Sequence, residues 1–100
     1  MIKHIVFWKV KDFAEGRDKQ ENAKLMKERI EKLKDSIPVI LHIEAGISIN
    51  HSDAAYDVAL YSEFKDEASL EIYQKHPAHL ELAAFNGKVA ETRAVVDYIV

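Results

Sequence analysis

The sequence predicts an α+β domain with a ferredoxin-like fold, in which a four-stranded antiparallel sheet carries two helices on one face. Three observations predict it: alternating apolar segments at 2–10, 39–50, 56–64 and 93–100, amphipathic segments at 17–35 and after Asp66, and the order of these segments. The order is strand, helix, strand, strand, helix, strand. Because crossovers between strands are right-handed, both helices are expected on the same face.

The first half of the chain gives one strand and one helix. Residues 2–10 alternate and are rich in β-branched and aromatic residues, as strands are. Residues 12–16 are expected to form a loop. Residues 17–35 form an amphipathic helix, with Ala23, Met26, Ile30 and Leu33 at helical spacing. Pro38 ends this helix because it disfavours helical backbone at the preceding residue.

The next two strands follow from alternation alone. In 39–50 one face is expected to carry Leu41, Ile43, Ala45, Ile47 and Ile49. Gly46 in this strand suggests a bulge or a close approach of another backbone. Residues 51–55 form a turn, and 56–64 form the third strand of the sheet.

The stretch 70–79, Leu-Glu-Ile-Tyr-Gln-Lys-His-Pro-Ala-His, is expected to contain a helix break. Asp66 is a good N-cap for the helix that precedes it. Pro77 pushes His76 towards an extended conformation and itself suits the first position of a new helix. We therefore expect one helix to end near Gln74 and a second to start at Pro77.

Composition bounds the class of protein. The chain has 100 residues, which predicts one domain spanning 1–100, and 48% of them are hydrophobic. It has no Cys, so disulfides, thiolate nucleophiles and thiolate metal sites are excluded. The start has no long apolar run, so we expect neither signal peptide nor membrane span, and a cytoplasmic location. The net charge of −3 and the mixed charges along 17–35 argue against a nucleic-acid partner.

The sheet face away from the helices is too apolar for water. It is expected to carry Phe7, Ala59, Tyr61, Val96 and Tyr98. An exposed apolar patch of this kind usually marks an interface. Two such sheets facing each other would close an eight-stranded α/β barrel, a homodimer with twofold symmetry. The alternative is a monomer with a few exposed aromatic residues.

Four side chains are candidates for proton transfer: His4, Tyr73, His79 and Asp97. Asp97 lies in an apolar strand and needs a partner, and the first strand, with His4, neighbours it in this topology. A carboxylate on one ring nitrogen would leave the other as a base, and a tyrosine hydroxyl can donate to a developing enolate. The alternative is that these groups form only a satisfied polar network in a small core.

Other kinds of site are weaker. His76 and His79 lack a third metal ligand in sequence, and Pro77 spoils a shared helical face. There is no glycine-rich phosphate loop and no serine in a nucleophile motif. We therefore expect no cofactor, and we leave metal binding open.

Five segments together resemble one family. They are Ile-Lys-His-Ile-Val-Phe-Trp-Lys at the start, Ile37-Pro38, Tyr-Asp-Val-Ala-Leu-Tyr-Ser-Glu-Phe at 56–64, Tyr-Gln-Lys-His-Pro-Ala-His at 73–79, and Val-Val-Asp-Tyr at 95–98. The chain is identified as a member of the stress-responsive dimeric α/β-barrel domain family. This resemblance implies a homodimeric ferredoxin-like barrel. The family mixes stress-stable proteins, proteins without an assigned activity, and a polyketide cyclase.

The resemblance to the cyclase implies Tyr73 and His79 as an acid–base pair and Asp97 as the group that orients the base. It also implies that His4 corresponds to a histidine on the first strand of the cyclase. This chain departs from the cyclase at Val58 and Ile30, where the cyclase has a histidine and a tyrosine. Some plant members also hold a divalent cation through backbone carbonyls, which here would lie near Lys34, Ile37 and Ile40.

Two hypotheses follow. The first is a stress-response homodimer of undefined biochemical activity, in which His4, His79 and Asp97 are structural. The second is a cofactor-free enzyme acting on a carbonyl or polyketide-like substrate, with His79 as base, Asp97 orienting it and Tyr73 polarising the carbonyl. A small apolar ligand would then sit in a pocket lined by Val6, Trp8, Met26, Ile30, Leu33 and Leu82. A cofactor-free monooxygenase is a third alternative.

Overall fold

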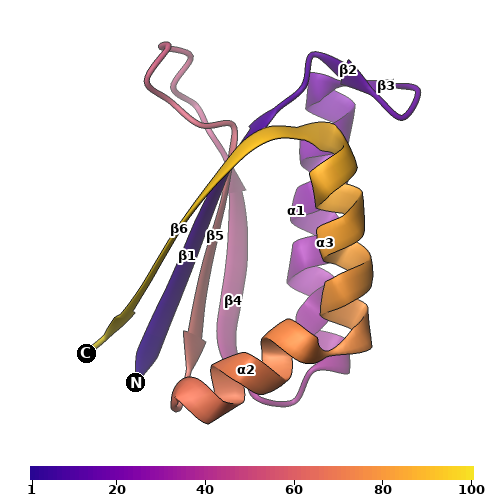
Figure 1. Cartoon of the computed structure of the whole chain (residues 1–100). Helices are drawn as coiled ribbons and strands as arrows, with labels where there is room; N and C mark the ends of the chain where they lie inside the picture. The colour runs from indigo at the N-terminus through magenta and orange to yellow at the C-terminus, as the bar shows by residue number, and fades with distance from the viewer.

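The computed structural model describes all residues, 1–100, and contains the predicted order of elements. The main strands are β1 (Ile2–Val10), β4 (Ile40–Ile47), β5 (Val58–Phe64) and β6 (Ala90–Ile99). The helices are α1 (Lys19–Ser36), α2 (Glu67–Lys75) and α3 (Pro77–Val89). All three helices lie on the same side of the sheet (Figure 1). The predicted ferredoxin-like α+β architecture is therefore confirmed.

The sheet has the strand order β4-β5-β1-β6, with every neighbouring pair antiparallel. β1 is thus central and pairs along its whole length with β6. His4 lies opposite Asp97, Val6 opposite Val95, and Trp8 opposite Arg93. Because side chains alternate along a strand, these three pairs all point to the face that the helices cover. The functional side chains discussed below come from this face.

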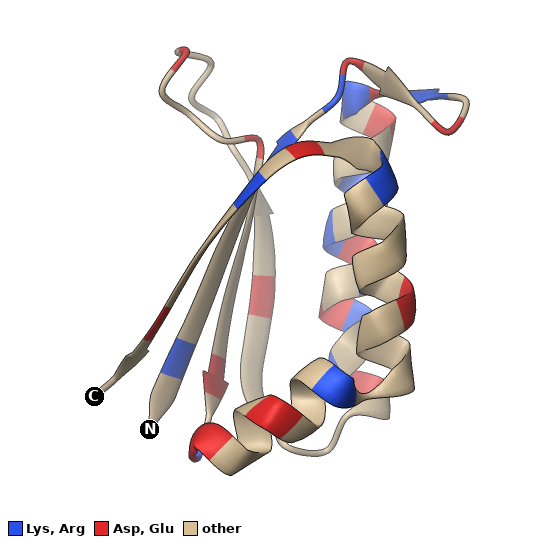
Figure 2. Ribbon diagram, viewed as in Figure 1, with Lys and Arg blue, Asp and Glu red and all other residues tan.

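Helix α1 begins at a capping box that the sequence encodes locally. The Asp18 carboxylate accepts from the backbone N–H of Glu21, and the Glu21 side chain accepts from the backbone N–H of Asp18. The buried face of the helix carries Ala23, Met26, Ile30 and Leu33, as the spacing predicted. Charges of both signs alternate on its other side (Figure 2). That outer face is solvated, as expected for an amphipathic helix on a sheet.

The predicted helix break lies at His76. Helix α2 ends at Lys75, His76 adopts an extended conformation, and Pro77 opens α3. The Nδ1 atom of His76 accepts a hydrogen bond of 3.0 Å from the backbone N–H of Ala78. His76 therefore caps α3, which accounts for its side chain without a metal. The break turns α2 across the lower end of the sheet while α3 runs alongside α1 (Figure 1).

Two local predictions were wrong. The segment predicted as a loop contains a short hairpin, β2 (Phe13–Ala14) and β3 (Arg17–Asp18), turned by Gly16 at a φ of 76°. The bulge in β4 lies between Ile40 and His42 rather than at Gly46. This extra residue moves Leu41 off the face that carries Ile43 and Ala45. Ile49 lies beyond the strand and is 95% exposed.

The outer face of the sheet exposes apolar side chains where the sequence predicted an interface. Phe7 is 39% exposed, Tyr98 42% and Val96 57%, while Ala59 and Tyr61 are half-buried. The Tyr61 hydroxyl donates to Glu63 at 2.6 Å, so this end of the face also has polar partners. The eight-stranded barrel that this face would form stays a prediction. None of the three helices is both long enough and apolar enough to cross a membrane.

Candidate active site

A cavity of about 260 Å³ lies between the helices and the inner face of the sheet. Its apolar walls come from β1, β5, α1 and α3, through Val6, Trp8, Leu60, Ile30 and Leu82. Of the six residues predicted to line a pocket, Val6, Trp8, Ile30 and Leu82 do so.

Met26 and Leu33, predicted to line the same pocket, do not line this cavity. Both are buried in the main core instead. Periodicity placed them correctly on the buried face of α1, but it could not indicate which part of that face meets empty space.

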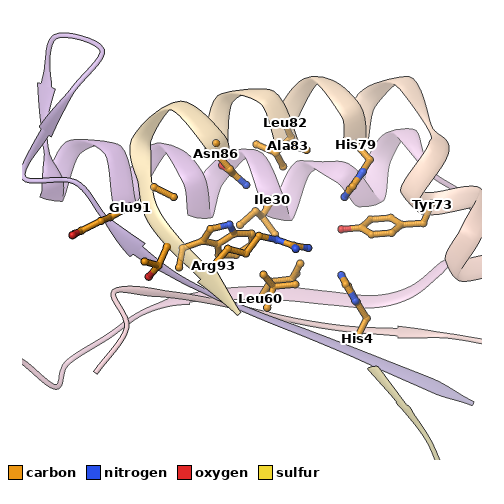
Figure 3. A pocket seen from close by; sticks show the side chains of 15 residues that line it. His4, Ile30, Leu60, Tyr73, His79, Leu82, Ala83, Asn86, Glu91 and Arg93 are labelled. Carbon is orange, nitrogen blue, oxygen red and sulfur yellow. The ribbon is translucent and has the colours of Figure 1, made fainter. Parts of the chain in front are cut away.

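Tyr73 is buried at one end of the cavity, with 1% of its surface exposed. Its ring is held by the Phe64 ring at 4.8 Å and by the His79 ring at 4.6 Å between centroids. Its hydroxyl points into the cavity (Figure 3) and forms no hydrogen bond with the protein. Burial raises the pKa of this phenol above its usual range, and the charge of Arg93 only partly opposes the shift. Tyr73 is therefore a protonated donor without a partner.

His79 lies in the first turn of α3 and its ring reaches down to the cavity (Figure 3). Its Nδ1 atom lies 3.0 Å from the backbone carbonyl oxygen of Gln74. Since a carbonyl only accepts, Nδ1 carries the hydrogen and donates, which leaves Nε2 with a free lone pair. Burial lowers the pKa of the imidazole, the Gln74 bond opposes this, and the charges of His4 and Arg93 lower it further. A neutral His79 is thus favoured at pH 7.

Asp97 does not orient His79, so that predicted pairing is wrong. Its carboxylate oxygen Oδ1 is bonded to Nδ1 of His4, across the β1–β6 ladder where the two residues are directly opposite. Cross-strand pairs are the nearest neighbours in a sheet, and β6 is the edge strand. Asp97 is also not buried, because 39% of its side chain is exposed. The carboxylate therefore fixes His4 and leaves His79 to the backbone.

His4 completes the cluster from the floor of the cavity. It is 2% exposed, and its ring lies 5.9 Å from the Tyr73 ring between centroids. Tyr73 thus contacts both histidines, with His79 on the helix side and His4 on the sheet side (Figure 3). The structure brings together three of the four predicted residues directly, and Asp97 joins them through His4.

A family comparison decides the classification. The model described as Stress responsive A/B Barrel Domain, or Dabb, matches residues 2–100. This chain belongs to the Dabb family. No match to this Dabb domain was found among curated proteins.

Solved structures show the same fold over nearly the whole chain. A dimeric protein of unknown function with a ferredoxin-like fold from Bacteroides fragilis has 35% identity and a TM-score of 0.86, covering 99% of this chain and 95% of its own. A dimeric ferredoxin-like protein of unknown function from Thermobifida fusca has 21% identity and a TM-score of 0.84, covering 99% and 90%. A hydroxynitrile lyase from Passiflora edulis has 20% identity and a TM-score of 0.83, covering 99% and 92%.

Four polar residues of this Dabb domain line the cavity but were not predicted as site residues: Asn86, Glu91, Thr92 and Arg93. Asn86 and Arg93 matter most for the argument below. Signals for both were present. Asn86 occurs four residues after Leu82 and three before Val89, in an otherwise apolar stripe. Arg93 alternates with Val95 and Asp97 on one strand face. A charged or amide group on a face predicted to be buried is itself a sign of a site.

Metal binding to side chains finds no support in the Dabb domain, because no group of three or more His, Asp or Glu side chains is arranged to hold an ion. His76 and His79, considered as a pair from their spacing, have separate roles, in a helix cap and in the cavity. The backbone cation site near Lys34, Ile37 and Ile40 stays a prediction. The Ile37 carbonyl there accepts a hydrogen bond of 3.3 Å from the backbone N–H of Ile40.

Proposed function

We propose that this Dabb domain is a cofactor-free enzyme that moves a proton on the carbon next to a carbonyl group of a small substrate. The observation that carries the proposal is the pair of unpartnered groups in the cavity, the Tyr73 hydroxyl and Nε2 of His79. A packed interior with His79 bonded only to Asp97 would have favoured a structural role. Instead there is a cavity of about 260 Å³, and His79 is free to act in it.

The proton transfer follows from these two groups. The substrate carbonyl oxygen accepts a hydrogen bond from Tyr73, which stabilises negative charge as it develops there. Nε2 of His79 takes the proton from the adjacent carbon, and the electron pair of that C–H bond moves to give an enolate. The imidazolium then returns the proton to the enolate, at the same or another carbon. Once the substrate has displaced water from the cavity, the buried surroundings of Tyr73 strengthen its hydrogen bond to the oxygen.

His4 and Asp97 position Tyr73 in this scheme. The Asp97 carboxylate holds the His4 ring, and that ring packs against the edge of Tyr73 at 5.9 Å between centroids. His4 is therefore a positioning residue. Because the hydroxynitrile lyase has the same fold, this scaffold is compatible with enzymatic activity, although fold alone does not assign an activity.

We further infer that the protein is a homodimer. The Bacteroides and Thermobifida neighbours are both described as dimeric, and one of them has 35% identity to this chain. Phe7, Ala59, Tyr61, Val96 and Tyr98 would form the interface, on the face of the sheet opposite the cavity. The cavity of each subunit would then stay accessible in the dimer.

Exchange of carbon-bound protons tests the proposed function directly. Pentane-2,4-dione and acetophenone are incubated with the protein in deuterated water, and loss of the signal from protons next to the carbonyl is followed by NMR. We expect exchange above the buffer rate for one of them, and its loss in His79→Ala. His42→Ala is the matched control, because His42 lies on β4 and does not line the cavity. Equal exchange rates in the wild type and in His79→Ala would refute His79 as the base.

A further inference from the structure

The cavity holds one cation that has no partner in the protein. The chain has three arginines. Arg17 donates to Asn22 and Arg29 stacks on the Phe85 ring at 4.2 Å. None of the three arginines forms an ion pair, and Arg93 alone has neither a side-chain hydrogen bond nor an aromatic partner. Figure 3 shows its guanidinium reaching into the cavity towards Tyr73. Arg93 is exposed on the edge strand β6 and also lines the cavity, so its guanidinium lies where a ligand entering from solvent would meet it.

The nearest acidic lining residue does not neutralise Arg93. Glu91 lies two residues before it on β6, but its carboxylate points away from the cavity (Figure 3). Arg93 in turn acts on both proposed catalytic residues, since its charge lowers the pKa of Tyr73 and of His79. Arg93, Tyr73 and His79 all line the same cavity of about 260 Å³, so one small substrate can contact all three.

A second observation concerns a polar side chain of the cavity wall, Asn86. Four polar side chains of the domain are buried: His4, Asn22, Ser62 and Asn86. The first three have hydrogen-bond partners. Asn86 is 5% exposed, and its Oδ1 atom is the one buried side-chain oxygen or nitrogen without a partner. The Asn86 oxygen is enclosed by protein, whereas Figure 3 shows the amide nitrogen turned towards the cavity. The amide nitrogen is a donor, and a carboxylate or carbonyl oxygen of a ligand can accept from it.

We propose that the substrate of this site is a small carbonyl compound that carries a carboxylate, with Arg93 binding the carboxylate. This rests on the proposed function, because the carbonyl end would be held by Tyr73 and His79. Arginine suits the task because its planar fork donates two parallel hydrogen bonds to a carboxylate. The apolar walls select a ligand with a compact hydrocarbon body. A cavity of about 260 Å³ lies below the usual range for drug-sized ligands, so the body is no larger than about one substituted ring.

The test compares two probes that differ in charge but hardly in shape, 4-acetylbenzoate and 4-acetylbenzamide. Binding to the purified protein is measured by NMR titration at low and high salt. We expect the carboxylate to bind about fivefold or more tightly than the amide at low salt, with the ratio shrinking as salt screens the charge. In Arg93→Gln the ratio should fall to about one, and Arg93→Lys should restore part of it. Arg29→Gln is the matched control and should keep the wild-type ratio.

The outcomes separate this inference from the proposed function. His79→Ala removes the base but keeps the cation, so it should lose proton exchange and keep the preference for the carboxylate. Equal binding of the two probes by the wild type, or an unchanged ratio in Arg93→Gln, would overturn the assignment of Arg93. A clear preference for the carboxylate without any proton exchange would support the anion site and refute the proposed enzyme.

Discussion

Replacing Tyr73 by phenylalanine separates a catalytic hydroxyl from a structural one. The change removes one oxygen and keeps the ring, so the contacts with Phe64 at 4.8 Å and with His79 at 4.6 Å between centroids survive. The hydroxyl has no partner in the protein, and the side chain is 1% exposed. We therefore expect no loss of folding stability in Tyr73→Phe, and a large loss of proton exchange.

The magnitude follows from the position of the hydroxyl, which is withdrawn from bulk water but opens onto the cavity. An unpaired buried hydroxyl costs roughly 1–3 kcal/mol in proteins. The cavity of about 260 Å³ can hold water next to it, which offsets part of that cost. The free energy of unfolding of Tyr73→Phe should thus lie between the wild-type value and about 1 kcal/mol above it. For a domain of this size that is a rise in Tm of up to about 4–8 °C.

Thermal and urea unfolding measure the stability, and proton exchange of the carbonyl probes measures the activity. Losing an oxyanion donor costs about 10²-fold or more in rate. Tyr56→Phe is the matched control, since Tyr56 does not line the cavity and its ring contacts Phe7 on the other face. A Tyr73→Phe protein that is destabilised by about 1 kcal/mol or more, yet exchanges protons at the wild-type rate, would refute the reasoning.

Three further predictions follow from the structure. Burial holds the pKa of His79 below 6.5, so on acidification the unfolded chain takes up a proton that the folded chain does not. The free energy of unfolding should therefore fall as the pH drops below about 6.5. Urea titrations of the wild type and of His79→Gln should show a weaker decline in the variant. Asn86→Leu removes a buried amide with an unpaired oxygen at nearly constant volume, so thermal unfolding should show a rise of about 1 kcal/mol in the free energy of unfolding. A loss of stability in this variant would contradict the claim that the Asn86 oxygen has no hydrogen-bond partner. Val96→Asp should shift the sedimentation of the protein from dimer to monomer, whereas Ile72→Asp on α2 should not; a dimeric Val96→Asp would exclude the outer sheet face as the interface.

The sequence predicted the fold well because each element carries its own local signal. The α1 stripe, the Asp66 cap and the break at Pro77 are all specified by residues within a few positions of one another. The hairpin at 13–18 and the bulge at 40–42 were missed, since both depend on pairing rather than on alternation. A single extra residue in β4 was enough to move Leu41 to the other face.

The sequence predicted which residues cluster at the site, but not which of them form hydrogen bonds with one another. Spacing and resemblance pointed to Tyr73, His79, Asp97 and His4, and they do lie in one cluster. Which histidine takes the carboxylate depends on the β1–β6 register, which pairs His4 with Asp97 and cannot be obtained from alternation alone. Arg93 and Asn86 were missed although both interrupt apolar patterns, because the sequence does not show that a cavity lies beside them.

The helix break at Pro77 has a consequence for how the proposed base is controlled. In an unbroken helix the Gln74 carbonyl would accept from the N–H of Ala78, but that N–H is bonded to His76 instead. The carbonyl set free in this way is the one that receives the proton of His79. The tautomer of the imidazole is thus set by a main-chain carbonyl, which stays available because the His76 side chain and Pro77 interrupt the helix. Any attempt to retune this histidine would therefore have to begin at positions 76 and 77, neither of which carries a carboxylate or other acidic group.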